Sequence, residues 1–310
     1  MNDIHILQTY AMPESAERAL AERFIVHKFH LAGDKDRLIA EVGGKVRAIA
    51  GIGVPAATMA RLPGLEIIAN FGVGYDSIDI PLAVSRGVRA TNTPDVLNDV
   101  VAELTIGLML ALARRIPQAD RYVREGRWPF GNLPLFGELR GYTLGIVGLG
   151  RIGREIAARA QAMKMRVVYH GRHEQPRQPY GFYADIVEMA RDADWLVAVT
   201  PGGGGTAGLV SRAVLEALGP SGYFVNVARG SVVDQAALVE LLAAGRLGGA
   251  ALDVFDGEPA VPEALFDMEN VVLSPHQGTA TEETRNAMGA LVVANLDAHF
   301  AGRPLLTQVA

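Results

Sequence analysis

Three side chains with complementary chemistry, Arg229, Glu258 and His276, each follow a short apolar run in the last part of the sequence. Arginine binds carboxylates through two parallel hydrogen bonds, histidine changes charge near neutral pH, and a neighbouring carboxylate fixes the orientation of a histidine ring. Hydride transfer to a carbonyl needs a group that holds the substrate, a proton donor and a partner for that donor. If the apolar runs are parallel strands, their carboxyl ends share one edge of a sheet, and the three residues are predicted to form a catalytic site.

Each of these residues also has an ordinary explanation when it is considered alone. His276 could cap an element, Glu258 could be a surface carboxylate, and Arg229 could be a partner in a salt bridge. The catalytic interpretation depends on their occurrence together with a cofactor-binding motif earlier in the sequence.

That motif is a glycine-rich turn at residues 148–153, with the pattern Gly-x-Gly-x-x-Gly. An apolar run precedes it and an amphipathic helical pattern follows it, which is the context of a dinucleotide-binding fold, although such a turn can also bind nothing. Gly148 permits a tight turn, Gly150 lets a pyrophosphate approach the backbone, and Gly153 lets helix and strand pack closely. The residues of the turn that we expect to contact a dinucleotide are Gly148, Leu149, Gly150, Arg151 and Ile152.

The end of the next apolar run indicates which nicotinamide cofactor binds. NAD-binding domains of this kind carry an acidic residue about 20 residues beyond the turn, where it contacts the ribose hydroxyls. Residues 169–173 read Tyr-His-Gly-Arg-His, so the acid is absent and Arg172 offers a guanidinium that suits a 2′-phosphate. This pattern favours NADPH, with His173 as a weaker second contact. The alternative is that Arg172 is an ordinary solvated residue at a strand end.

The elements that must position these residues form two series of alternating strand and helix patterns, which predict parallel sheets covered by helices. We expect two doubly wound α/β domains with a cleft between them. A flavodoxin-like substrate domain should span residues 1–98 and 279–310, and a Rossmann dinucleotide-binding domain should span residues 99–278. One long helix is expected at residues 100–124, and the helix at 282–299 should return to the first domain. The expected strands are 4–8, 24–28, 48–51, 66–69 and 88–90 in the first domain, and 143–147, 166–169, 195–200, 222–227, 249–254 and 271–274 in the second.

Composition excludes several other classes of protein. The 310 residues include no cysteine, which excludes disulfides and a cysteine nucleophile and fits a reducing cytoplasm. A formal net charge of −5 and 6% aromatic residues give no general attraction to nucleic acid. The most apolar helical stretch, residues 104–113, is well short of the roughly 20 residues that span a bilayer, and the first residues lack a secretory pattern. We therefore expect a cytoplasmic protein that acts on a small molecule, with no metal, nucleic-acid or membrane partner.

Together the motifs resemble the D-isomer-specific 2-hydroxyacid dehydrogenase family, in the family's order and over nearly the whole sequence. The resemblance implies an oxidoreductase in which Arg229 binds the carboxylate and carbonyl of a 2-oxo acid. It also implies that His276 is the acid/base and that Glu258 is its partner. The motifs that carry the resemblance are residues 70–76, 92–94 with 102–103, 148–153, 226–230, 250–255 with 258–259, and 274–276.

The resemblance also assigns residues outside this group of three. The backbone amides of Val73 and Gly74 would complete the carboxylate site, and closure of the cleft would exclude water. Asp253 would bind the nicotinamide carboxamide. The cofactor contacts implied beyond the glycine turn are Thr200, Pro201, Thr206, Val227, Ala228, Asp253, His276 and Gly278.

Within the family, residues 126–131, the Arg172 region and residues 283–288 are similar to the NADPH-dependent glyoxylate and hydroxypyruvate reductases, including plant enzymes that accept hydroxyphenylpyruvate. We therefore expect reduction of glyoxylate or hydroxypyruvate to a D-2-hydroxy acid, by a two-fold homodimer. Trp128 either shapes a substrate pocket across the dimer interface or simply packs. The sequence departs from the family at residues 202–205, where four glycines replace a Leu-Thr pair and a polar run, so the cofactor contacts of that loop are undetermined.

Two other functions are compatible with the sequence. One is an NAD-dependent dehydrogenase of 3-phosphoglycerate or another bulky hydroxy acid. The other is a nucleotide-sensing binding protein or corepressor, because such proteins use the same fold and retain similar residues. A measurement of turnover separates the binding protein from either enzyme.

Overall fold

The computed structural model describes residues 3–310, and this part of the chain divides into two compact units. The first unit comprises Met1–Leu97 and Thr279–Ala310, and the second comprises Asn98–Gly278. The expected division differs from this one only at residue 98, which begins helix α5 (Asn98–Ala113). No helix in residues 3–310 is long and apolar enough to cross a membrane.

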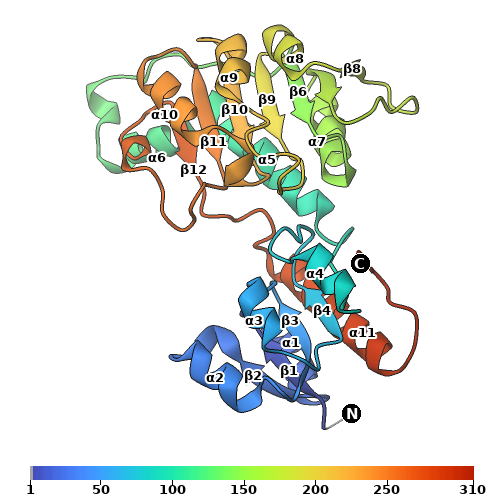
Figure 1. Ribbon diagram of the computed structural model, residues 1–310. Coiled ribbons are helices and arrows are strands. Elements are labelled where there is room, and N and C mark those ends of the chain that lie inside the picture. The colour runs from blue at the N-terminus through green and yellow to red at the C-terminus, as the bar shows by residue number, and fades with distance from the viewer. Residues whose placement is uncertain (1–2) are drawn as a thin grey trace. The chain divides into compact units, whose positions relative to one another are not determined.

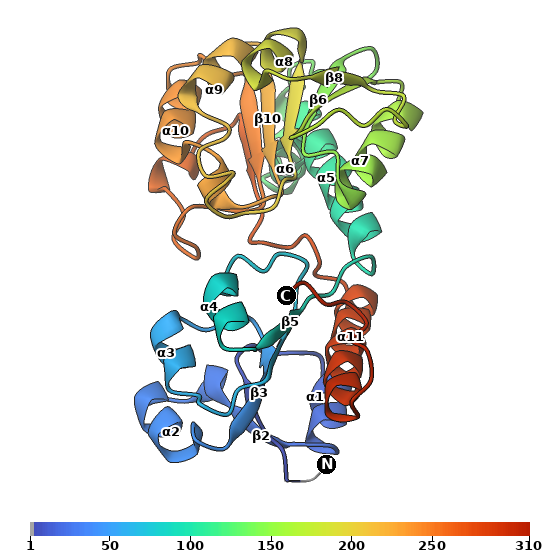
Figure 2. The same ribbon diagram turned by 45° about the vertical axis from the view of Figure 1, so that its right-hand side comes forward.

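The first unit contains a parallel sheet between two layers of helices. Its strands are β1 (His5–Gln8), β2 (Ile25–Lys28), β3 (Val46–Gly51), β4 (Ile67–Asn70) and β5 (Arg89–Thr91), and its helices are α1 (Glu14–Ala21), α2 (Lys35–Val42), α3 (Ala56–Ala60), α4 (Ile80–Ser85) and α11 (Glu282–Phe300). Within residues 3–310 this sheet has the order β2-β1-β3-β4-β5, which is the flavodoxin-like order. Helices α2, α3 and α4 pack on one face, and α1 and α11 lie on the other (Figure 2).

Helix α11 returns to the first unit, as the sequence predicted, and packs on α1 and β4. The side chain of Thr281 caps its first turn by accepting a hydrogen bond from the Thr284 amide. The residues after α11 continue along β5, where Val309 N donates to Ala90 O and Ala90 N donates to Ala310 O. The last part of the chain therefore belongs to the hydrogen-bonded structure of the first sheet.

Glu66, which immediately precedes β4, joins this sheet to α11. Its carboxylate accepts hydrogen bonds from Arg47 Nε at 2.6 Å and from His299 Nε2 at 3.1 Å. Burial raises the pKa of the Glu66 carboxyl, but the hydrogen bonds from Arg47 and His299 outweigh burial and hold that pKa below its ordinary value. The ionised carboxylate is thus the form that the folded unit stabilises.

The second unit is a larger doubly wound sheet. Its strands are β6 (Thr143–Val147), β7 (Arg166–His170), β8 (Gly181–Tyr183), β9 (Trp195–Ala198), β10 (Tyr223–Asn226), β11 (Gly249–Leu252) and β12 (Val271–Leu273), and its helices are α5, α6 (Ile116–Arg124), α7 (Arg151–Ala162), α8 (Ile186–Asp192), α9 (Arg212–Leu218) and α10 (Gln235–Ala243). In residues 98–278, all of which are described, the strand order is β12-β11-β10-β9-β6-β7-β8. This is the Rossmann order with a further strand at one edge, and the order reverses between β6 and β9.

Helices cover both faces of the second sheet because its strands are apolar on both sides. All five residues of β6 are buried, as expected for a parallel strand with helices above and below. Helices α8, α9 and α10 pack on one face and α5 and α7 on the other (Figure 1). The fold class that the sequence predicted is confirmed in both units.

Two details of the second unit differ from the expectation. The single long helix is wrong, because α5 ends at Ala113 and α6 begins after Arg115, whose φ of 46° is left-handed. Pro117 has no N–H, and in a continuous helix its ring would clash with the carbonyl of Ala113. Strand β8 was not expected, because it is a short, partly exposed edge strand without an apolar run.

Candidate active site

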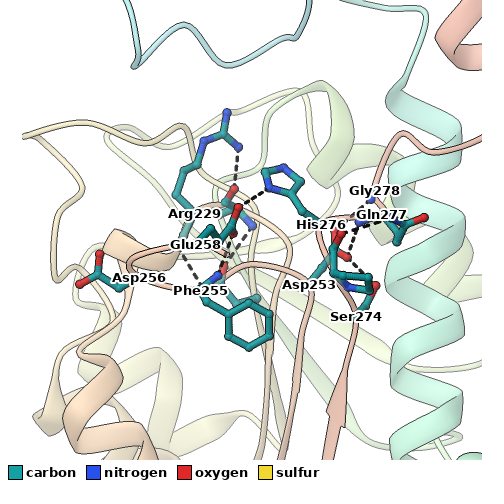
Figure 3. Close-up of polar contacts among 12 residues, drawn as sticks. Arg229, Asp253, Phe255, Asp256, Glu258, Ser274, His276, Gln277 and Gly278 are labelled. Atoms are coloured by element: carbon teal, nitrogen blue, oxygen red, sulfur yellow. Dashed lines mark hydrogen bonds and ion pairs between the residues drawn. The ribbon is translucent and has the colours of Figure 1, made fainter. Parts of the chain in front are cut away.

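Arg229, Glu258 and His276 lie at one edge of the second sheet, beyond the carboxyl ends of β10, β11 and β12 (Figure 3). These three strands are neighbours and run parallel, so the loops that follow them emerge side by side. The structure thus brings together the three side chains that the sequence pattern selected.

His276 and Glu258 form a direct pair. His276 Nδ1 lies 2.8 Å from one carboxylate oxygen of Glu258, and the other oxygen accepts a hydrogen bond from Phe255 N at 2.9 Å (Figure 3). An ionised carboxylate only accepts hydrogen bonds, so Nδ1 carries a proton. Within residues 3–310, Nε2 of His276 has no hydrogen-bond partner, which leaves this nitrogen available to exchange a proton with a bound molecule.

The loop that carries His276 is held by the buried carboxylate of Asp253. One oxygen of Asp253 accepts from Ser274 Oγ at 2.6 Å and from Gln277 N at 2.7 Å, and the other accepts from Gly278 N at 2.9 Å. His276 itself has a left-handed φ of 54°, an uncommon conformation for a residue with a Cβ. Asp253 thus fixes the backbone that orients the His276 ring, a contribution that the sequence did not reveal.

Arg229 lies in a turn that the buried side chain of Asn226 stabilises. Asn226 donates to Arg229 O at 3.0 Å and accepts from Ala228 N at 3.0 Å. A Cβ at Gly230 would lie 1.9 Å from the carbonyl carbon of Phe255, so only glycine lets this turn approach the loop that leads to Glu258. The side chain of Arg229 is half-buried.

The glycine-rich turn lies at the other side of the same sheet edge, between β6 and α7. A Cβ at Gly153 would lie 2.3 Å from Gly148 O, whereas a Cβ at Gly150 would meet no described atom within 4 Å. The first hydrogen bond inside α7 runs from Arg154 N to Gly150 O, so the amides of the first turn are not used within the helix. Open space at Gly150, next to a helix N-terminus with its favourable dipole, is a suitable site for a pyrophosphate. The residues present therefore fit a dinucleotide.

The segment after β7 lies beside this turn, because Gly148 N donates to His170 O at 2.9 Å. Arg172 follows two residues later and is exposed, as is His173. Neither side chain has a hydrogen-bond or ion-pair partner among the residues that the structure describes. A Cβ at Gly171 would meet no described atom within 4 Å, so there is open space next to Arg172.

The loop after β9 also approaches the turn. A Cβ at Gly148 would lie 3.0 Å from Thr200 Cα, which shows how closely the two loops pack. The hydroxyl of Thr206 donates a hydrogen bond to Pro201 O at 2.7 Å, which joins the two ends of the glycine-rich stretch between them. The other expected contacts, Val227, Ala228 and Gly278, follow β10 and β12 at the same edge.

In the first unit, the loop after β4 presents two backbone amides. The side-chain amide of Asn70 donates to Gly72 O at 2.9 Å and Gly74 O at 2.8 Å, and that of Asn92 donates to Val73 O at 2.9 Å. These bonds hold the carbonyl groups of the loop. The N–H groups of Val73 and Gly74 have no acceptor in residues 3–310, so they are free to bind an anion.

Trp128 lies in a short helix, η2 (Trp128–Phe130), and 64% of its surface is exposed. Its indole N–H lies 3.3 Å from Asn132 Oδ1. Both alternatives for this residue, a substrate pocket and simple packing, stay predictions.

Comparison with known proteins identifies the family. Residues 106–278 match the sequence model of the D-isomer specific 2-hydroxyacid dehydrogenase, NAD binding domain. The chain belongs to the D-isomer specific 2-hydroxyacid dehydrogenase family, and the prediction from the sequence motifs is confirmed.

Individual relatives match the whole chain. It is 46% identical to glyoxylate/hydroxypyruvate reductase A of Arabidopsis thaliana and 45% identical to hydroxyphenylpyruvate reductase of Plectranthus scutellarioides. Each comparison covers 100% of this chain and 100% of the relative. A solved structure of an NADPH-dependent glyoxylate/hydroxypyruvate reductase from Sinorhizobium meliloti, in complex with NADP and malonate, is 42% identical with a TM-score of 0.93. That comparison covers 100% of this chain and 97% of the other.

Proposed function

We propose that this protein reduces small 2-oxo acids, such as glyoxylate and hydroxypyruvate, to D-2-hydroxy acids with NADPH. The observation that carries the proposal is the His276–Glu258 pair, with an unpaired Nε2, at the sheet edge that also presents Arg229. The names of the relatives with matching length support the same substrate class.

In the proposed mechanism, Arg229 binds the substrate carboxylate and carbonyl through charge-assisted hydrogen bonds. The free amides of Val73 and Gly74 have the same anion-binding role. NADPH, when bound, supplies the hydride to the carbonyl carbon. His276 donates its Nε2 proton to the carbonyl oxygen as negative charge develops there, and Glu258 stabilises the ring while it is protonated.

For the cofactor, we assign the pyrophosphate to the turn at residues 148–153 and the 2′-phosphate to Arg172, with His173 as a second contact. Residues 169–173, at the end of β7, include no acidic residue, which supports NADPH because a carboxylate there would repel the phosphate. Asp253 uses three of about four acceptor positions to hold the His276 loop, which leaves one for the nicotinamide carboxamide. The remaining proposed contacts are Thr200, Pro201, Thr206, Val227, Ala228 and Gly278.

The test is the initial rate of reduced-nicotinamide oxidation, measured with NADPH and separately with NADH. The substrates are glyoxylate, hydroxypyruvate, pyruvate, hydroxyphenylpyruvate and 3-phosphohydroxypyruvate. We expect the highest kcat/KM with NADPH and glyoxylate or hydroxypyruvate. A preference for NADH and the phosphorylated acid would identify the bulky-acid dehydrogenase instead. Nucleotide binding without turnover of any acid would identify a sensing protein.

We further propose that the protein is a homodimer in the cytoplasm. The segment after α6 exposes large apolar side chains, with exposed fractions of 64% for Trp128, 90% for Phe130 and 100% for Leu135, which a second copy would cover. The absence of cysteine supports a reducing compartment. Light scattering should give the mass of a dimer, and the mass of a monomer would contradict the proposed dimer. Cell fractionation should recover the protein with the cytoplasm, and recovery with membranes would contradict the proposed location.

A further inference from the structure

Gln175 joins the segment that carries Arg172 to the glycine-rich turn. Its side-chain amide donates to Leu149 O, inside the turn, at 2.8 Å. Its backbone N–H donates to the hydroxyl of Tyr169 at 2.6 Å. Tyr169 belongs to β7, is 1% exposed, and packs against Phe182 of β8. One residue is therefore bonded both to the turn and to the buried strand beside it.

The rest of this segment makes hydrogen bonds only within itself. Among the described residues from Arg172 to Pro179, no other residue makes a hydrogen bond that leaves the segment. Gln178 N bonds to Gln175 O, which is an internal turn. Pro176 directly follows Gln175 and restricts it to extended conformations. Arg172 therefore lies between two attachments to the turn, His170 O on β7, which accepts from Gly148 N, and the two hydrogen bonds of Gln175.

We propose that Gln175 is a positioning residue that sets the preference for NADPH over NADH. This inference rests on the proposed function of Arg172. The pyrophosphate and the 2′-phosphate belong to one ligand, so a cation recognises the second group fully only if its distance from the turn is fixed. A segment released from the turn keeps Arg172 but must be ordered again each time the cofactor binds, at a cost in conformational entropy.

The experiment compares Gln175→Ala with Gln178→Ala, a matched control in the same segment whose side chain has no hydrogen bond among the described residues. Calorimetry on the protein without cofactor measures the binding of 2′,5′-ADP and of 5′-AMP, which differ by the 2′-phosphate. In Gln175→Ala, the affinity for 2′,5′-ADP should fall about three- to tenfold while that for 5′-AMP is unchanged, where tenfold is about 1.4 kcal/mol. The KM for NADPH should rise equally, with kcat retained and the KM for NADH unchanged. Gln178→Ala should match the wild type.

A double-mutant cycle with Arg172→Ala tests whether Gln175 acts through Arg172. If it does, Gln175→Ala should change 2′,5′-ADP affinity by less than about twofold once Arg172 is absent. Equal losses for both nucleotides would show that Gln175 supports only the turn, and unchanged affinity for both would show that it positions nothing; either result overturns the inference. An Arg172→Ala variant that loses no 2′,5′-ADP affinity would instead overturn the proposed cofactor assignment, which is a separate outcome.

Discussion

The pairing of His276 with Glu258 can be tested by the substitution Glu258→Gln. The glutamine keeps one oxygen, which can still accept the hydrogen bond from Phe255 N and hold the loop. The other oxygen becomes an NH₂ group, which is a donor and cannot stabilise a protonated ring through Nδ1. The variant therefore removes the charge-assisted bond of 2.8 Å while it keeps the shape of the site.

The expected loss of kcat depends on the charge on this hydrogen bond and on its exposure to water. A hydrogen bond to a charged group contributes about 1.5–3 kcal/mol. The side chains of His276 and Glu258 are 50% and 35% exposed, so water screens their interaction. We therefore take the lower end, about 1.5 kcal/mol, which corresponds to roughly a tenfold lower kcat.

The assay is kcat for glyoxylate reduction at saturating NADPH and pH 7, with Asp256→Asn as the control. Asp256 lies in the same loop, its side chain has no hydrogen-bond or ion-pair partner among the described residues, and it points away from His276 (Figure 3). The control removes the same charge and should change kcat by less than about twofold, while 2′,5′-ADP affinity stays constant in both variants. A kcat for Glu258→Gln within about twofold of the wild type, or equal losses in both variants, would refute the proposed pairing.

Three other substitutions test the proton donor, the turn and the first unit. His276→Ala should lower turnover roughly a thousandfold with 2′,5′-ADP affinity unchanged, because the proton donor is lost; turnover near that of the wild type would place the donor elsewhere. Gly153→Ala introduces a Cβ 2.3 Å from Gly148 O and should destabilise the second unit by about 1–3 kcal/mol. Thermal unfolding would show this as a lower Tm, and an unchanged Tm would contradict the packing argument. Glu66→Gln should lower the free energy of unfolding at pH 7, because hydrogen bonds hold the pKa of the Glu66 carboxyl below its ordinary value of 4.5. A lowered pKa stabilises the fold at pH values above the ordinary pKa, and this stabilisation is lost as the pH falls through the folded-state pKa. Urea unfolding should therefore show no difference in stability between the variant and the wild type in strong acid. A difference of equal size at pH 7 and in strong acid would contradict the assignment.

Most strands could be predicted from the sequence because of how parallel sheets are buried. Strands such as β4, β6 and β9 have helices on both faces, so all of their residues are buried and most are apolar. Strand β8 lies at the sheet edge with one neighbour, so its three residues show no such run. The break between α5 and α6 was predictable from Pro117, but the apolar periodicity on both sides favoured one helix.

Some residues of the candidate site could likewise be predicted from the sequence and others could not. Arg229, Glu258 and His276 could be found because each combines a reactive side chain with a position in the loop that follows a strand. The residues that hold them, Asn226 and Asp253, act through bonds to loop backbones, and the geometry of those loops is not encoded in any local pattern. The anchor at Gln175 was missed for the same reason.

The return of α11 to the first unit has a consequence for the order in which the chain folds during synthesis. The second unit is continuous in sequence, whereas the first lacks the helix that packs on α1 and β4 until residues 279–310 have been made. At about 5–20 residues per second, synthesis of residues 98–278 takes on the order of 10–40 s. We expect the part of this sheet face that α11 covers to stay exposed for that period and to be a surface on which chaperones act. Proteolysis of ribosome-bound chains should then show protection of the second unit before the first, and early protection of the first unit would contradict this order.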